Sequence, residues 1–225
     1  MPPIVRHAAL AAAGLFVAGG VGLATLGWIT SGGPATAAGV IVEGTEPLTP
    51  ARIADSASGI VTGNPLGDVT IVEFFDYQCP VCRQVHPDVK ALVEEDGGIR
   101  LVHKHWPIFG AGSEHAAELA MAARWQNRYD PVHEAFMGLS GRLNRDGVRA
   151  AAAEAGLDLA RADADLQARR AEVDAALAEA AREAILMGLQ GTPGFLIGNY
   201  VVPGGLDKAG LAELVAGARA GKDAL

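Results

Sequence analysis

Two cysteines are the residues of this sequence best suited to chemistry. Cys79 and Cys82 are the only cysteines in the chain, and Pro80 and Val81 separate them. Backbone N–H groups at the start of a helix favour a thiolate, which is the form of cysteine that attacks disulfides. Because Cys82 follows one helical turn later on the same side, the spacing predicts a redox dithiol. We expect Cys79 to be the nucleophile and Cys82 to lie deeper and resolve a mixed disulfide.

Other uses of the cysteine pair fit the sequence less well. Half of a zinc site would need two further ligands, and a structural disulfide at this spacing would close too small a loop to add much stability. A copper-handling site using both sulfurs would be expected beside Met- or His-rich tracts. We interpret the isolated histidines as surface or interface polar residues and predict no metal site; they are His86, His103, His105, His115 and His133. Trp106 is interpreted as a packing residue.

The elements around the pair follow from hydrophobic periodicity and turn residues. A helix that begins at Pro80 costs no backbone hydrogen bond, and Gly97 and Gly98 predict where it ends. The sequence then turns wholly helical from Ser113 to about Gly188, with its last long helix carrying Leu166 to Ala184. The other predicted elements are strands at Val69–Phe75 and Ile99–His105, a hairpin of Gly194–Gly198 and Tyr200–Val202, and a final helix capped by Asp207.

The segment Val-Glu-Phe-Phe-Asp-Tyr-Gln-Cys-Pro-Val-Cys resembles the active-site strand and helix of DsbA-like proteins, the exported bacterial branch of the thioredoxin superfamily. The resemblance extends over roughly Gly67 to Gly217. It implies an α/β, thioredoxin-like fold with a helical insertion, at about residues 113–188, between a βαβ and a ββα half. It also implies a thiol:disulfide oxidoreductase that needs no cofactor.

The same resemblance assigns three supporting residues. Gly191-Thr192-Pro193-Gly194 resembles the family's cis-proline loop, in which the residue before proline contacts bound substrate. Glu73 resembles the acid buried beneath the disulfide, and Lys104 on the next strand is a candidate partner for it. The alternative for Glu73 is a solvated acid at a strand edge.

The amino-terminal residues 1–30 predict a signal-anchor or a signal peptide. Met1–His7 carries Arg6 and no acid, and Ala8–Thr30 is uncharged. As a helix that stretch would span roughly 34 Å, against a bilayer core of about 30 Å. Cleavage near Ala37, at Ala35-Thr36-Ala37, is the alternative to an anchor. Residues 31–66 are expected to form a stalk, with a short helix from Thr49 to Ser58, and residues 67–225 the folded domain.

The net charge limits the classes of partner that this protein is expected to bind. A net charge of −8 without a run of Lys or Arg argues against nucleic-acid binding. An exported domain is expected to act on exported proteins that carry thiols or disulfides and to exchange electrons with a redox partner in the membrane. Oxidation of clients is the leading hypothesis, with a disulfide reductase or isomerase, or a copper-handling module, as alternatives. The sequence leaves open the direction of electron flow, the clients and the oligomeric state.

Overall fold

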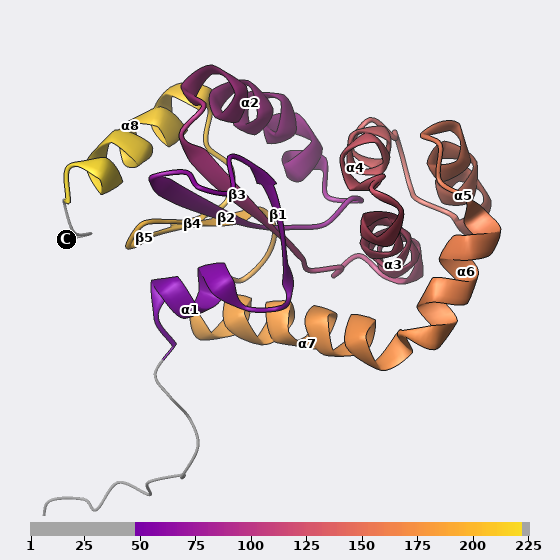
Figure 1. The fold of residues 1–225 in the computed structure, drawn as a ribbon. Coiled ribbons are helices and arrows are strands. Elements are labelled where there is room, and N and C mark those ends of the chain that lie inside the picture. The colour runs from indigo at the N-terminus through magenta and orange to yellow at the C-terminus, as the bar shows by residue number, and fades with distance from the viewer. Residues whose placement is uncertain (1–47, 222–225) are drawn as a thin grey trace, which may run out of the picture. The chain divides into compact units, whose positions relative to one another are not determined.

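The computed structural model of the chain describes residues 48–221. Figure 1 shows one mixed β-sheet with helices on both faces and a helical block beside it. In chain order the elements are α1 (Pro50–Asp55), β1 (Gly59–Gly63), β2 (Val69–Phe75), α2 (Pro80–Asp96), β3 (Ile99–His105), α3 (Ala111–Ala123), the 3-10 turn η1 (Arg124–Gln126), α4 (Tyr129–Met137), α5 (Arg145–Glu154), α6 (Leu159–Ala168), α7 (Arg170–Leu186), β4 (Gly194–Ile197), β5 (Tyr200–Pro203) and α8 (Lys208–Arg219).

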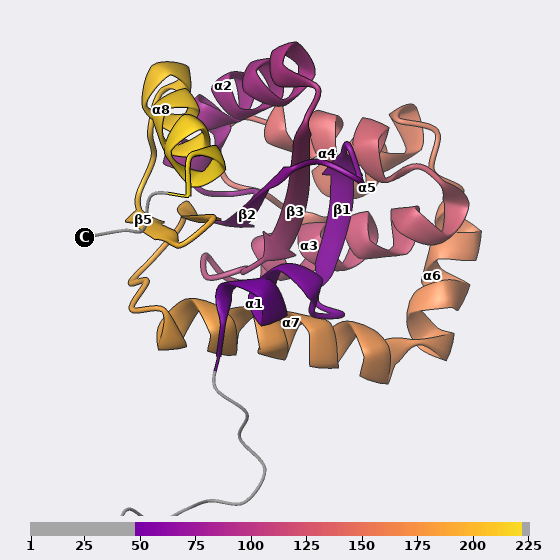
Figure 2. The ribbon, with the colours of Figure 1, turned by 60° about the vertical axis from the view of Figure 1, so that its left-hand side comes forward.

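The sheet has five strands in the order β1-β3-β2-β4-β5. β2 and β3 are parallel and joined through α2, whereas the other neighbouring pairs are antiparallel. Helices α2 and α8 cover one face, and α1 and α7 run along the other, as both views show (Figures 1 and 2). This is a thioredoxin-like α/β fold with helices α3 to α7 inserted between its βαβ and ββα halves, as the sequence predicted.

Strand alternation distributes the apolar side chains of the central strands between two cores. Ile71 and Leu101 pack with residues of α2 and α8, including Val89. Val72 and Val102 point to the opposite face, where they join residues of α1 and α7. Because both faces are covered, β2 and β3 are almost continuously buried, which explains their apolar and β-branched composition.

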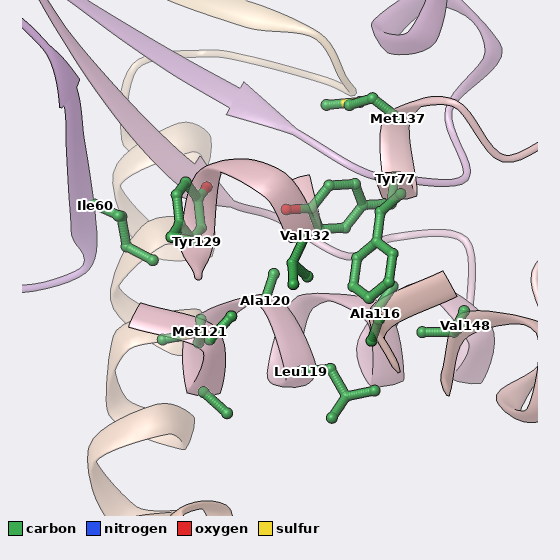
Figure 3. Close-up of a cluster of buried hydrophobic side chains, with 14 of the residues drawn as sticks. Ile60, Tyr77, Ala116, Leu119, Ala120, Met121, Tyr129, Val132, Met137 and Val148 are labelled. Carbon is green, nitrogen blue, oxygen red and sulfur yellow. The ribbon is translucent and has the colours of Figure 1, made fainter. Parts of the chain in front are cut away.

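The helical insertion has its own core, built around α3. Small residues of α3, among them Ala116 and Ala120, are fully buried against neighbouring helices. Figure 3 shows Tyr77 and Tyr129 standing over α3, with Val132 of α4 between them. Tyr77 belongs to the loop that follows β2, so this core is continuous with the segment that carries the two cysteines.

Most predicted elements are confirmed within one or two residues, with one exception in the insertion. The helix expected to run through Leu166 to Ala184 is two helices, because the backbone departs from helical geometry at Arg169 (φ −117°, ψ 25°). The bend lets Leu166 pack on the helical core while Ala184 is buried against the sheet. Helix α7 itself contacts both cores, through Val173 in the helical core and Ala184 against the sheet.

Part of the predicted stalk is folded. Thr49 caps a short helix, as expected, but Gly59–Gly63 then forms the edge strand β1, antiparallel to β3. The run is short and lacks the apolar alternation of an ordinary strand, so only its pairing with β3 reveals it. Residues 1–47, including the predicted membrane segment and cleavage site, lie outside the described residues. Among residues 48–221, no helix has the length and apolar character to cross a membrane.

Lys104 does not pair with Glu73, contrary to the sequence-based expectation. In the parallel register Glu73 lies opposite His103, and Lys104 lies opposite Phe74, so alternation sends the two side chains to opposite faces. The Lys104 Nζ instead contacts Glu183 Oε2 of α7 at 2.9 Å and Ser58 Oγ at 2.6 Å. Both charged side chains are buried, at 0% and 1% exposure, so the pair joins the segment before β1, the strand β3 and α7.

Removing one partner of this pair should be costly, because the other would stay buried without a counter-charge. We expect Glu183→Ala to lower the free energy of unfolding by about 3–5 kcal/mol, measured by urea denaturation. Glu179→Ala, one turn earlier on α7 and half-exposed, should cost less than about 1 kcal/mol. Lys104→Met combined with Glu183→Leu should recover most of the loss. Equal effects of the two single alanine variants would contradict this account.

Candidate active site

Cys79 occupies the N-cap of α2, as its spacing predicted. Pro80 is the first helical residue, and the Cys79 Sγ accepts a hydrogen bond from the Cys82 backbone N–H at 3.4 Å. The Cys79 thiol also lies 3.2 Å from the Thr192 carbonyl oxygen, to which it donates. The sulfur is therefore held between a helix start and a loop that lies more than a hundred residues away in sequence.

The two sulfurs differ strongly in acidity. The pKa of Cys79 is lowered to about 6, first by a hydrogen bond with the Cys82 side chain and then by Thr192 and the backbone N–H groups of the helix start. The pKa of Cys82 is raised, mainly by burial and then by its hydrogen bond with Cys79. Both are free thiols in this structure, with 2% and 0% exposure. One sulfur is thus set up to be a thiolate and its neighbour to hold a proton.

The Thr192–Pro193 peptide bond is cis, as the sequence resemblance implied. The loop brings the Thr192 backbone to Cys79, and the Thr192 hydroxyl is buried without a hydrogen-bond partner among the described residues. Val81, between the cysteines, is 43% exposed. The predicted site residues Cys79, Cys82, Pro80, Val81, Thr192 and Pro193 therefore gather at one place in the fold.

Asp76 organises the loops around the cysteines, and the sequence reasoning did not single it out. Its backbone carbonyl accepts from the Cys79 N–H at 3.0 Å. Its carboxylate accepts from the N–H groups of Gln78, Ile108 and Phe109 at 2.7, 2.7 and 3.0 Å. The signal was present, because an acid directly after a buried strand is suited to capping loop N–H groups. A buried carboxylate thus fixes the loop after β3 beside the cysteines.

Glu73 is fully buried on the α2 side of β2, which confirms the inward orientation and excludes the solvated-edge alternative. Neither carboxyl oxygen has a hydrogen-bond partner among the described residues. Burial raises the pKa of Glu73 to about 8, and its charge acts on Cys82. The basic group closest to this carboxyl group is His103, whose Nδ1 lies 3.8 Å from the Glu73 Oε2.

The interpretation of the histidines as surface or interface residues is wrong for four of them. His115 is 9% exposed, and His103, His105 and His133 are only 3%, 2% and 4% exposed. The rings of the last three pack with aromatic side chains, and the Tyr77 hydroxyl shares a hydrogen bond of 2.9 Å with His133 Nδ1. The insertion covers the ends of β2 and β3, and no sequence pattern indicates which strand face it will cover. Within residues 48–221, no cluster of three or more His, Cys, Asp or Glu has the geometry of a metal site. Trp106 is 8% exposed and packs in the core beside α7, as expected.

Comparison with known protein families identifies the family to which this domain belongs. Residues 70–216 match the family of DSBA-like thioredoxin domains. This chain belongs to that family. The match spans β2 through most of α8 and so includes both cysteines, the helical insertion and the cis-proline loop.

Three solved structures share the fold of this chain. A thioredoxin-like oxidoreductase from Silicibacter pomeroyi DSS-3 is 42% identical with a TM-score of 0.73, over 79% of this chain and 100% of that chain. The thiol-disulfide exchange protein alpha-DsbA2 from Wolbachia pipientis shares the fold at 23% identity and a TM-score of 0.70, over 74% and 90%. A periplasmic thioredoxin-like protein from Salmonella enterica serovar Typhimurium also shares the fold, at 23% identity and a TM-score of 0.67, over 78% of this chain and 99% of that chain.

Two curated relatives are much longer proteins. Na(+)/H(+) antiporter NhaA 1 of Salinispora arenicola is 29% identical over 72% of this chain, and NhaA 3 of Salinispora tropica is 27% identical over 61%. This DSBA-like chain spans about a quarter of their length, at 25% and 21%.

The lowered pKa of Cys79 gives a direct test. We expect alkylation of the reduced protein by iodoacetamide to show a midpoint near pH 6 and to modify Cys79 before Cys82. Cys82→Ala should move the midpoint to higher pH, because the largest cause of the lowered pKa is lost. Mass spectrometry of the labelled peptides identifies the site. First labelling at Cys82, or an unchanged midpoint in the variant, would contradict the assignment.

The raised pKa of Glu73 predicts how stability depends on pH. An acid whose pKa is about 4.5 in the unfolded chain and about 8 in the folded protein stabilises the fold below pH 4.5. That contribution is lost as the pH rises through 8. The unmodified protein should therefore lose about 2–4 kcal/mol of unfolding free energy between pH 4.5 and pH 8, measured by urea denaturation, and Glu73→Gln should not show this loss. Glu94→Gln, an exposed acid on α2, is the control. Parallel curves for Glu73→Gln and the unmodified protein would contradict the prediction.

Proposed function

We propose that this protein is an extracytoplasmic thiol:disulfide oxidoreductase that oxidises the thiols of exported proteins through the Cys79–Cys82 disulfide. The difference between the sulfurs carries the proposal. A thiolate held at a helix start is a good nucleophile and also a good leaving group, whereas a buried sulfur with a raised pKa keeps its proton. Membership of the DSBA-like family supports the reaction class.

In the proposed cycle a client thiolate attacks the Cys79 sulfur of the oxidised enzyme. The S–S bond breaks, its electron pair goes to Cys82, and the Cys82 thiolate takes the proton of the Glu73 carboxyl group. A second client thiolate then attacks the mixed disulfide, forming the client disulfide and releasing Cys79 as a thiolate. The enzyme is now reduced by two electrons and needs a disulfide or quinone oxidant to regain its bond. Glu73 supports this scheme because it is buried, unpaired and able to hold a proton at neutral pH.

The surface around Cys79 is suited to an unfolded client. Val81, Ile108 and Phe109 are 43%, 42% and 43% exposed. Ile108 and Phe109 are fixed through their backbone N–H groups to Asp76, so these apolar side chains stay beside the cysteines. A chain with exposed apolar residues would bury surface there, and the Thr192 backbone beside Cys79 offers a partner for its main chain.

The direction of electron flow follows from the acidity of Cys79. A thiolate that is stabilised in the reduced enzyme makes reduction more favourable, so the disulfide becomes a stronger oxidant. A reductase would need the opposite balance. The lowered pKa of Cys79 therefore favours the oxidase over the reductase or isomerase.

The proposed location rests on the amino-terminal sequence. Residues 8–30 would anchor the domain at the outer face of the cytoplasmic membrane, or cleavage near Ala37 would release it. The two longer relatives are named as Na(+)/H(+) antiporters. A redox partner in that membrane would reoxidise Cys79. Ion transport is not proposed, because this chain spans only a quarter of those relatives.

Two measurements test the proposal. The reduction potential in glutathione buffers should lie at or above about −180 mV, whereas a reductase would lie near −270 mV. Cys82→Ser should accumulate mixed disulfides with an unfolded model client that carries a disulfide, because its Cys79 thiolate attacks that disulfide, releases one client sulfur as a thiolate and has no resolving sulfur beside it. Cys79→Ser is the matched control and should form none. A potential near −270 mV would contradict the oxidase role, and trapping by Cys79→Ser alone would reverse the cysteine roles.

A further inference from the structure

A cavity of about 300 Å³ opens between α2, α4 and the β1–β3 edge of the sheet. The cavity lies on the sheet face that carries Glu73. The residues that line it do not include Val81 or Phe109 of the proposed client surface. Its walls mix apolar and titratable side chains. They are Thr62, Gly63, His86, Val89, Lys90, Val93, Glu94, Leu101, His103, Asp130, His133 and Glu134.

His103 connects this cavity to Glu73. On one side its Nε2 shares a hydrogen bond of 3.0 Å with the Thr62 hydroxyl, which lines the cavity and is half-buried. On the other side its Nδ1 lies 3.8 Å from the Glu73 Oε2, and neither atom has a hydrogen-bond partner among the described residues. The register fixes this order, because Glu73 and His103 are paired residues of β2 and β3.

This geometry suits an imidazole that passes protons. A neutral imidazole accepts a proton at one nitrogen while it donates from the other, so no imidazolium has to form. That matters here, because burial lowers the pKa of His103 to about 3. A small rotation of the Glu73 carboxyl group would close the gap to a hydrogen bond. Thr62 can then pass a proton between His103 and the cavity, because a hydroxyl both donates and accepts.

We propose that Thr62 and His103 form a proton relay that connects Glu73 to solvent through the cavity between α2 and α4. The proposal rests on the proposed function, in which Glu73 exchanges a proton with Cys82. Thr62 and His103 are positioning residues, since they act on the sulfurs only through Glu73. Nothing in the relay touches the client, so it can work while the cysteine face is covered.

The relay is needed when the enzyme regains its disulfide. With an oxidant of the disulfide class, the Cys79 thiolate first forms a mixed disulfide and releases one oxidant sulfur as a thiolate. Cys82 must then lose its proton to Glu73 before its electron pair attacks Cys79 and expels the second oxidant sulfur. Below pH 8 Glu73 already holds a proton. That proton has to leave first, from Glu73 to His103 Nδ1 and from His103 Nε2 to Thr62 and the cavity. When the enzyme is reduced again, a proton travels the same route inward and restores the histidine tautomer.

Other titratable groups surround the relay and could tune it. Burial and its histidine neighbours lower the pKa of His133, and burial lowers that of His105. The His86 ring contacts the His133 ring, and its Nε2 shares a hydrogen bond of 3.1 Å with the Glu134 Oε1. The groups that line the cavity or pack around Glu73 and His103 are His86, Lys90 and Glu94 of α2, Tyr129, Asp130, His133 and Glu134 of α4, His105 of β3, Tyr77 of the loop after β2, and the sulfurs of Cys79 and Cys82.

The test separates the two steps of reoxidation. The full-length reduced protein is mixed with glutathione disulfide, quenched with acid and analysed by mass spectrometry for the glutathione adduct of Cys79. Thr62→Val keeps the shape of the side chain and removes the hydroxyl. We expect adduct formation at the unmodified rate and adduct resolution slowed on the order of tenfold at pH 6–7. The slow step should show an increased solvent deuterium isotope effect, and the defect should shrink above pH 8, where Glu73 is already ionised.

The controls distinguish a relay from a packing effect. Thr62→Ser retains the hydroxyl and should resolve the adduct at the unmodified rate, as should Thr70→Val on strand β2. The reduction potential of Thr62→Val should be unchanged, because the relay alters neither end state. His103→Gln, if it folds, should show the same slow resolution.

Two results would refute different claims. If Thr62→Val resolves the adduct like Thr62→Ser at a pH where Glu73→Gln is slow, the relay is wrong and the role of Glu73 stands. If Glu73→Gln also resolves the adduct at the unmodified rate, the proton exchange between Glu73 and Cys82 is wrong and the relay has nothing to serve. Neither result bears on the oxidase assignment, which the reduction potential tests separately.

Discussion

The parallel pairing of β2 with β3 is the constraint on which the other features of this molecule depend. Its register places Glu73 beside His103 on the face covered by α2, and it sends Lys104 to the opposite face. One strand pair therefore provides both a buried acid on the face covered by α2 and a buried lysine that anchors α7 through Glu183. A shift of the strand register by one residue would exchange the two faces, so that neither the buried acid nor the buried lysine would keep its position. The side-chain arrangement on both faces of the sheet is thus set by one register.

The chemistry of the site comes from two environments that lie a single helical turn apart. Cys79 stands at the start of α2, where unpaired N–H groups favour negative charge, and Cys82 lies inside, where burial opposes it. Neither effect requires a charged neighbour in the Pro80-Val81 pair. The loops that surround Cys79 are held by the Asp76 carboxylate, so the apolar rim and the nucleophile keep a fixed relation.

The helical insertion closes the far side of this site. Its residues cover the ends of β2 and β3 and so bury His103 and His105 of β3 together with His133 of α4. Burial keeps these rings neutral near pH 7, and a neutral imidazole is the form that can both accept and donate a proton. The cavity at the edge of the insertion leaves one part of this buried region within reach of water. In this way the insertion both insulates Glu73 and leaves it a route to solvent.

The sequence by itself determined the local features. The strand and helix bounds around the cysteines, Cys79 as helix cap, the proline loop at Thr192–Pro193 and the DSBA-like resemblance all depend on residues close together in the chain, where spacing and turn chemistry act directly. Tertiary structure alone decided which distant groups meet. It set Lys104 on Glu183 instead of Glu73, made an edge strand of Gly59–Gly63 and buried the histidines. These outcomes depend on sheet register and on which face the insertion covers, and both are settled by packing between segments far apart in sequence.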